Sequence, residues 1–301
     1  MDKFAHMQIF VGIVEAGSIS GAAERLGLAK SAVSRRLTEL EERLGASLIQ
    51  RTTRRLNLTD SGRAYYARCV ALLADLDEAE SAVSQAHGSL KGGLKVALPL
   101  SFGLLHLAPL IQAFMTRHPE VRFELDFNDR QIDLMQEGFD LAIRIANLPD
   151  SSLIARRLAP IRHLLSASPA YLAKHGTPKR PEDLRHHVCL AYSNLANPGV
   201  WHYRTLDGVA GSVQVPVKLK ANNGDFLYQT ALAGHGLILH PTFYLSEALR
   251  SGALVPVLTD IVWPELNAYA VYPPTRHLSS RVRALVDFLA KRFEGEPAWD
   301  Q

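Results

Sequence analysis

The chain has 301 residues, a formal net charge of +3 and 47% hydrophobic residues. This length predicts two or three domains with cores of their own, and the composition is that of an ordinary globular protein. No apolar run approaches the roughly 18 residues that a membrane helix needs, and the N-terminus lacks signal-peptide character, so a cytoplasmic protein with no membrane partner is expected. The two cysteines, Cys69 and Cys189, lie far apart in the sequence and provide neither a disulfide framework nor a metal-binding CxxC motif.

Basic residues are concentrated in one segment near the N-terminus. Between residues 25 and 68 there are ten lysines or arginines and four acidic residues, a local net charge of +6. Four acidic residues follow between 75 and 80. A basic segment beside an acidic one indicates that the first contacts a polyanion, although a charge run taken alone is more often a solvated surface.

Three short helices are predicted in this part of the chain. Apolar residues at steps of three and four predict the first helix over residues 3–16, and a glycine follows each helix as its stop. Ser18 or Ser20 can cap the second helix, and the third starts at Ser31. The residues expected to face inward are Phe4, Met7, Phe10, Val11 and Val14 in the first helix, Ala22, Ala23 and Leu26 in the second, and Val33, Leu37, Leu40 and Leu44 in the third.

The third helix has a polar face opposite its apolar side. At 100° per residue, Ser31, Arg35 and Thr38 lie about 140° to 200° from Val33. Two short helices joined through a glycine form a helix-turn-helix, whose second helix enters the DNA major groove. Arginine can bind guanine O6 and N7 together, and hydroxyl groups can bind phosphates or base edges. The polar face is therefore predicted to contact DNA.

A short hairpin is predicted after the third helix, in "LIQRTTRRLNLTDSG". Leu56 and Leu58 alternate with polar residues, and Arg51, Arg54 and Arg55 lie near the turn. Such a wing can contact backbone phosphates or a narrow minor groove. A single loop arginine is more often only solvated, but three beside a helix-turn-helix favour contact with DNA.

Residues 22–62, "AAERLGLAKSAVSRRLTELEERLGASLIQRTTRRLNLTDSG", resemble the LysR-type transcriptional regulators, and the later elements agree in order along essentially the full chain. The resemblance implies an N-terminal all-α winged helix-turn-helix with a long linker helix, and a C-terminal α/β effector domain of two periplasmic-binding-protein-like subdomains. It implies the boundaries 1–58, 59–90 and 91–301, with subdomain I at about 92–161 and 267–301 and subdomain II at about 162–266. The DNA-binding residues expected are Lys30, Ser31, Ser34, Arg35, Thr38, Arg51, Arg54 and Arg55.

The linker helix is predicted to start at Thr59 or Asp60 and to run to about His87. Its apolar or small residues alternate in steps of four and three, which is the pattern of a helix that pairs with a second subunit. The same pattern also allows packing on the helix's own chain. We interpret Cys69 as a packing residue rather than a redox switch, since nothing nearby would lower its pKa. The expected dimer seam is Tyr65, Cys69, Leu72, Leu76, Ala79 and Val83.

The C-terminal part alternates strands and helices, which predicts an α/β domain. Strands are expected at 94–100, 121–127 and 139–145, with a helix from 104 that turns Leu104, Leu107, Ile111 and Phe114 inward. Further strands and helices are expected in the segments 163–176, 187–193 and 219–241, and a strand at 267–273 followed by a helix from Ser279 to Phe293.

Effector contacts are expected beyond the carboxyl ends of these strands, where helix N-termini offer free N–H groups. Ser101 and Asn222 would bind an anionic or polar group, and Arg144 would neutralise a carboxylate, although each residue can equally serve as a cap or a turn. The first crossing between subdomains is expected at 144–147 and the return at 240–241, while Trp201 and His202 line the cleft or fill the second core. The effector-binding residues expected are Ser101, Phe102, Asn128, Arg144, Asn147, Trp201, His202, Asn222, Asn223 and His240.

Other classes of protein fit the sequence less well. An enzyme would need a constellation such as GxSxG, a Walker loop or GxGxxG after a strand, so no catalytic residue, metal site or cofactor is expected. A solute-binding transport protein would share the α/β half but not residues 1–60. The expected partners are double-stranded promoter DNA with an inverted repeat and a small anionic or aromatic effector, with RNA polymerase as a further candidate. The resemblance implies a homotetramer, a dimer of dimers.

Overall fold

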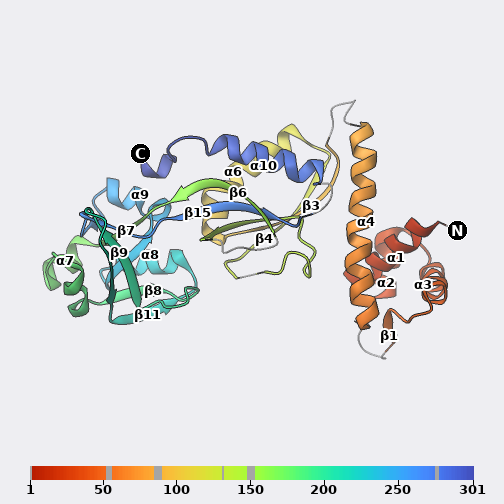
Figure 1. The fold of residues 1–301 in the computed structure, drawn as a ribbon, viewed down its shortest axis with the longest axis horizontal. Helices are drawn as coiled ribbons and strands as arrows, with labels where there is room; N and C mark the ends of the chain where they lie inside the picture. Colours follow the sequence, from red (N-terminus) through yellow and green to blue (C-terminus); the bar gives the residue numbers. More distant parts are fainter. Residues whose placement is uncertain (1, 52–55, 85–89, 131, 148–152, 275–277) are drawn as a thin grey trace. The chain divides into compact units, whose positions relative to one another are not determined.

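The fold is that of a computed structural model, which describes residues 2–51, 56–84, 90–130, 132–147, 153–274 and 278–301 (Figure 1). The chain divides into two compact units. The first consists of Met1–Gly92 with Asp133–Gly138 and Pro274–Arg283, and the second of Gly93–Ile132, Phe139–Pro273 and Ala284–Gln301. Within the described residues, no helix is both long enough and apolar enough to cross a membrane.

Three helices begin the first unit at almost the predicted positions. They are α1 (Lys3–Ala16), α2 (Ile19–Leu26) and α3 (Lys30–Leu44). Each ends at a glycine in the left-handed conformation, with φ of 63°, which residues with a side chain rarely adopt. The Ser18 hydroxyl accepts a hydrogen bond from the Gly21 N–H at 3.0 Å and so caps α2. The third helix starts one residue earlier than expected.

Three of the predicted inward-facing residues are exposed. The core contains Phe10, Val33 and Leu37, as predicted, but Phe4, Leu26 and Leu44 are exposed. In α1 the buried residues are His6, Ile9, Phe10 and Ile13, a stripe turned away from Phe4. Leu26 and Leu44 are the last residues of their helices, where a side chain has fewer neighbours.

The wing and the linker helix follow. Strands β1 (Ile49–Arg51) and β2 (Leu56–Leu58) pair antiparallel, as the hairpin prediction required. Glu41 of α3 fixes this hairpin, because its Oε1 accepts hydrogen bonds from the N–H groups of Leu48 at 2.7 Å and Ile49 at 3.2 Å. Helix α4 (Asp60–Ser84) then runs past α1 and α2 (Figure 1). The Thr59 hydroxyl accepts from the Gly62 N–H at 2.9 Å, so Thr59 caps the helix.

The second unit contains two five-stranded sheets and one small sheet. The first sheet has the order β4-β3-β5-β15-β6 and consists of β3 (Gly92–Leu98), β4 (Val121–Phe127), β5 (Leu141–Ala146), β6 (Ile154–Ile161) and β15 (Leu266–Tyr272). The second has the order β11-β8-β12-β7-β13 and consists of β7 (His163–Ala167), β8 (Cys189–Tyr192), β11 (Val217–Ala221), β12 (Leu237–Pro241) and β13 (Val255–Pro256). The small sheet, β10-β9-β14, consists of β9 (Val200–Thr205), β10 (Ala210–Gln214) and β14 (Ile261–Val262), and these strands were not predicted.

Helices cover both large sheets. Those that follow β3 are α5 (Leu100–Phe102), a π-helical turn (Gly103–Leu107) and α6 (Ala108–Arg117), and the last long helix is α10 (Ser280–Arg292). Figure 1 shows α6 and α10 on one side of the first sheet, where the rings of Phe114 and Phe288 lie 5.5 Å apart. The second sheet carries α7 (Pro169–His175), α8 (Gly224–Leu232) and α9 (Thr242–Arg250). Two 3-10 turns lie at Pro181–His186 and Ala298–Asp300.

The π-helical turn explains one wrong prediction. Leu107, Ile111 and Phe114 are buried as expected, but Leu104 is exposed. A π turn is wider than an α turn, and Leu104 lies within this one, so its side chain falls out of phase with the α-helical stripe that follows. The α-helical period used for the prediction therefore placed Leu104 on the wrong face.

The chain passes between the two large sheets at different residues from those predicted. Strand β6 ends at Ile161 and β7 begins at His163, so Arg162 makes the first crossing, and residues 263–265 between β14 and β15 make the return. The predictions of crossings at 144–147 and 240–241 are wrong. After β5 the next strand, β6, belongs to the same sheet, and β12 leads into α9 beside its own sheet.

Candidate functional sites

The polar face of α3 presents the predicted DNA-binding side chains. Lys30, Ser31 and Arg35 are exposed, while Ser34 and Thr38 are half-buried. The side chain of Arg35 is 73% exposed and its Nε lies 3.6 Å from Oε1 of Glu39. Such an exposed pair one helical turn apart is weak, so the guanidinium can exchange Glu39 for another acceptor. The Thr38 hydroxyl donates to the Ser34 carbonyl at 3.2 Å.

Of the three wing arginines, the structure describes only the backbone of Arg51. Arg51 belongs to β1 and pairs with Leu56, but its side chain lies outside the described residues. Arg54 and Arg55 also lie outside them. Their predicted contacts with phosphates therefore stay predictions.

The predicted dimer seam is wrong for Cys69, whereas Tyr65 is half-buried and its part in the seam stays a prediction. Cys69 is completely buried in the core of α1, α2 and α3, and the ring of Tyr65 lies 5.6 Å from that of Phe10. Burial raises the pKa of the Cys69 thiol, as expected of a packing residue. Heptad spacing alone does not tell packing on a partner from packing on the same chain, and here the first turns of α4 pack on α1. Leu72 is 45% exposed and Leu76 is half-buried, while the side chains of Ala79 and Val83 lie outside the described ones.

Two predicted effector contacts belong to cores. Phe102 is buried among aromatic rings, 5.2 Å from Phe243 and 5.5 Å from Trp299. Trp201 is buried in the core of the second sheet, 6.4 Å from Trp263. Their assignment to effector binding is wrong, because neither ring is free to contact a ligand. His202 is exposed, since adjacent residues of a strand point to opposite faces.

Three further candidates lie around the first sheet. The Asn128 N–H donates to the Leu98 carbonyl at 3.0 Å, so the end of β4 lies beside the end of β3. The Asn128 side chain accepts from the Arg130 N–H at 3.2 Å, which is a turn contact. Arg144 donates from its guanidinium to the Ile132 carbonyl, and Asn147 is exposed after β5.

Ser101 forms the centre of a polar network between the two large sheets. Its side chain is buried, and its hydroxyl donates to the Asp225 carboxylate, in the first turn of α8. On the other side, the Leu100 N–H donates to Asp129 Oδ1 at 2.9 Å. The Asn194 amide donates to the Asp129 carbonyl at 3.1 Å. The network thus joins α5 and the end of β4 to elements of the second sheet.

Tyr244 and His240 complete the network. The Tyr244 hydroxyl is hydrogen-bonded to Ser101, and burial, together with the charges of Asp225 and Asp129, raises the pKa of Tyr244 well above its usual value. His240 Nε2 lies 3.2 Å from the Gly224 carbonyl, so it carries the proton. Burial lowers the pKa of His240 to about 3, so the ring is neutral near pH 7.

The two asparagines before α8 have different roles. Asn223 Oδ1 accepts from the Phe226 N–H at 2.8 Å and caps the helix, while Asn222 is exposed. The N-cap of α8 is therefore Asn223 and not Asn222. The sequence analysis missed Asp225 and Tyr244 as functional residues, and also Tyr192, whose hydroxyl accepts from the Asn194 amide at 3.2 Å. Only Asp225 carries a local signal, as an acidic residue in a first helical turn after "ANNG".

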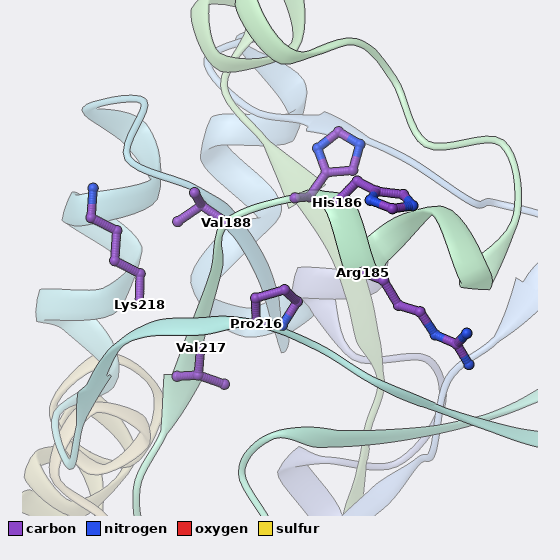
Figure 2. A pocket seen from close by; sticks show the side chains of 7 residues that line it. Arg185, His186, Val188, Pro216, Val217 and Lys218 are labelled. Carbon is purple, nitrogen blue, oxygen red and sulfur yellow. The ribbon is translucent and has the colours of Figure 1, made fainter.

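The structure also has a hollow of about 360 Å³ in the second unit, lined by Arg185, His186, His187, Val188, Pro216, Val217 and Lys218. Figure 2 shows that the charged ends of Arg185 and Lys218 point away from each other. They do not converge on one ligand group, and none of the predicted effector residues lines this hollow. Within the described chain, no group of three histidine, cysteine or acidic side chains could hold a metal ion.

A winged helix-turn-helix followed by an α/β region with two mixed sheets defines a DNA-binding regulator that carries a ligand-binding domain. Residues 4–63 match the family described as "Bacterial regulatory helix-turn-helix protein, lysR family", and residues 87–294 match the "LysR substrate binding domain". The chain therefore belongs to the LysR family of transcriptional regulators, and these relatives are regulators rather than enzymes.

Individual relatives match over nearly their whole length. An uncharacterised helix-turn-helix regulator of Haemophilus influenzae is 38% identical over 285 residues, which are 95% of this chain and 99% of the relative. The solved structure of CrgA from Neisseria meningitidis is 34% identical with a TM-score of 0.62, covering 98% of this chain and 100% of CrgA. The Vibrio cholerae virulence activator AphB is 27% identical with a TM-score of 0.62, covering 97% and 100%.

Proposed function

We propose that this regulator binds inverted repeats in promoter DNA as an oligomer and changes that binding when a small molecule enters the junction around Ser101. The observation that carries the proposal is the exposed face of α3, where Lys30, Ser31 and Arg35 have no core to contact. The wing supports it, because Glu41 ties the hairpin to the same helix. DNA as partner places the protein in the cytoplasm.

The domain boundaries 1–58, 59–90 and 91–301 belong to this proposal. Its two effector subdomains, 92–161 with 267–301 and 162–266, are supported by sheet membership, since β3 to β6 and β15 form one sheet and β7, β8 and β11 to β13 form the other. In this arrangement the Ser101 network lies between the subdomains. An effector bound there acts through its different affinity for two arrangements of them.

Selection from random duplex DNA with the full-length protein tests the DNA-binding part of the proposal. We expect enrichment of an inverted repeat, because two recognition helices of a dimer contact half-sites one helical turn or a multiple apart. Binding of unrelated duplexes as tight as that of the enriched ones would contradict sequence-specific recognition.

The part of α4 that begins at Leu72 is the surface proposed for pairing with a second subunit. Leu72 is 45% exposed, although the preceding stretch of the same helix contributes the buried Cys69 to the core. We expect Leu72→Asp to shift the full-length protein toward monomers in analytical ultracentrifugation, because a charge at a helix seam loses its solvation. Arg63→Asp, in the same helix but before that stretch, is the control. Unchanged assembly in both variants would remove Leu72 from the interface.

The charges of the Ser101 network indicate which effector it would accept. Asp129 and Asp225 bring two carboxylates to the junction, and neither forms an ion pair with a described lysine, arginine or histidine. Each carboxylate can accept about four hydrogen bonds. A ligand anion beside these two carboxylates would be repelled. We therefore propose an effector with a protonated amine, in place of the anionic effector expected from sequence.

Ligands of equal length and different charge test this proposal. We expect 1,4-diaminobutane to raise the melting temperature of the full-length protein more than 1,4-butanediol, and succinate to have no effect. At 100 times its dissociation constant a ligand stabilises by about 2.7 kcal/mol. Asp225→Asn should remove the response to the diamine, while Asp207→Asn, at an exposed loop, should keep it. If succinate alone stabilised the protein, the effector would be an anion rather than a cation. The prediction for the DNA selection would not be affected.

A further inference from the structure

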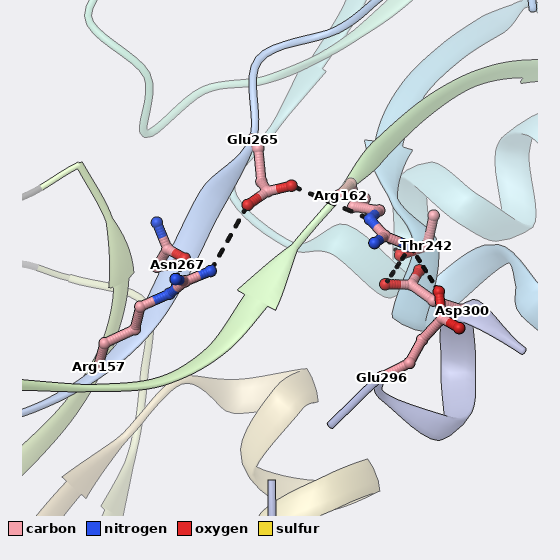
Figure 3. Close-up of polar contacts among 7 residues, drawn as sticks. All are labelled: Arg157, Arg162, Thr242, Glu265, Asn267, Glu296 and Asp300. Atoms are coloured by element: carbon pink, nitrogen blue, oxygen red, sulfur yellow. Dashed lines mark hydrogen bonds and ion pairs between the residues drawn. The ribbon is translucent and has the colours of Figure 1, made fainter. Parts of the chain in front are cut away.

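Arg162 holds together the two connections between the large sheets (Figure 3). It is the residue between β6 and β7, and its Nη1 lies 3.0 Å from Glu296 Oε1 and 3.6 Å from Asp300 Oδ2. Its Nε lies 3.9 Å from Oε2 of Glu265, the residue before β15 on the return connection. The guanidinium of Arg162, on the outgoing connection, thus contacts both the return connection and the C-terminal segment.

Neighbouring hydrogen bonds fix the same two connections. The Arg162 carbonyl accepts from the Thr242 N–H at 2.9 Å, at the start of α9. Arg157 Nη2 lies 3.8 Å from Glu265 Oε1, and Arg157 Nε donates to Asn267 Oδ1 at 2.6 Å. The hydrogen bond between Arg162 and Thr242 joins the outgoing connection to α9 beside the second sheet, whereas the contacts of Arg157 fix the return connection to the first sheet.

The C-terminal segment also packs on elements that belong to both sheets. The ring of Trp299 lies 4.5 Å from His106 and 5.5 Å from Phe102, which follow β3 of the first sheet. The same ring lies 6.4 Å from Phe243, in α9 beside the second sheet. Residues 293–301, which we call the C-terminal clamp, therefore contact both halves next to their connections.

The seated clamp has polar atoms that are poorly satisfied. The side chain of Asp300 is 2% exposed, and its Oδ2 has no hydrogen-bond partner among the described residues, so Arg162 at 3.6 Å is its compensating charge. Trp299 Nε1 and His106 Nε2 are likewise buried without a described partner. Desolvated groups of this kind oppose the aromatic packing, which makes a seated and a released clamp closer in free energy.

We propose that the C-terminal clamp is a releasable brace on the hinge between the two subdomains. Seated, it holds both connections through Arg162 and both halves through Trp299. Released, it allows the subdomains to change their angle. The clamp would thereby set how readily the junction around Ser101 opens, without contacting the ligand, and this inference is independent of which effector binds.

Hydrogen exchange of the full-length protein without ligand tests the clamp. Arg162→Gln leaves Asp300 buried without its counter-charge, and a stop codon at Gly295 removes most of the clamp. We expect each change to speed exchange about tenfold at the Thr242 amide and in peptides covering 161–164 and 263–267. We expect the combined variant to exchange no faster than either alone, because both changes release one element.

Arg156→Gln is the matched control. Arg156 lies in β6 and its guanidinium pairs with Asp287 of α10, so this pair stays within the first subdomain. Its loss should leave exchange at the hinge unchanged. Hinge peptides that exchange as in the wild type in either clamp variant would overturn the proposal. So would faster exchange spread equally over β3 and β8, which would mean a general loss of stability.

Discussion

Gly62→Ala should destabilise the first unit by about 3 kcal/mol, near the upper end for overpacking of a core. A Cβ at this position would overlap the Leu48 carbonyl oxygen and lie 2.9 Å from the Leu48 carbonyl carbon. A backbone carbonyl cannot swing aside as a side chain can. The strain has to move either α4 or the start of β1, and Leu48 is also the residue whose N–H binds Glu41. The wing would then lose its fixed position on α3.

Gly12→Ala is the control for this substitution. It lies in α1 of the same unit, and its new Cβ would meet the end of the Leu26 side chain at 3.2 Å, which is exposed and can shift. Alanine gains up to about 1 kcal/mol over glycine in a helix, so this variant should be neutral or more stable. Urea unfolding followed by circular dichroism measures both. Equal stability of the two variants would show that α4 does not rely on its close approach to Leu48.

Arg35→Ala should weaken binding to the selected DNA by about 1 to 3 kcal/mol and relax its sequence preference. The side chain is 73% exposed on α3, and its ion-pair partner among the described residues is Glu39 in the same helix. The loss of that exposed pair should change folding stability by well under 1 kcal/mol. Fluorescence anisotropy with the selected duplex and a scrambled one measures the affinity and the preference.

Arg35→Lys separates charge from geometry. Lysine keeps the positive charge but cannot form the two parallel hydrogen bonds of a guanidinium. We expect this variant to bind the scrambled duplex as the wild type does, with the same salt dependence, and to lose much of the preference for the selected one. A variant with full preference would mean that Arg35 contacts only phosphates.

Local signals explain which parts of the fold were predictable. The three N-terminal helices have a serine or aspartate before them or a glycine after them, and such caps act within a few residues. Strand β4 was placed correctly by the alternation in "VRFELDF". Leu104 was misplaced because the π turn after Phe102 depends on how the helix packs, which the period does not encode.

The candidate effector site, by contrast, depends on contacts between distant residues that local signals do not predict. Ser101 was found from its place after a strand, but the hydrogen bond that defines its role joins it to Asp225, 124 residues later. Phe102, beside it, has the same position relative to β3 and belongs to the aromatic core instead. Position after a strand therefore selected the region, whereas side-chain packing decided which residues can meet a ligand.

By itself, the sequence determined the family, the helix-turn-helix and the alternation of strands and helices, because caps, glycine stops and periodic apolar residues act over short distances. Only the tertiary structure decided that Cys69 packs on the same chain, that Asp225 faces Ser101, and that Arg162 links both connections to the C-terminus. These contacts join residues far apart in the chain. They depend on how whole sheets and helices are oriented, which no local pattern specifies.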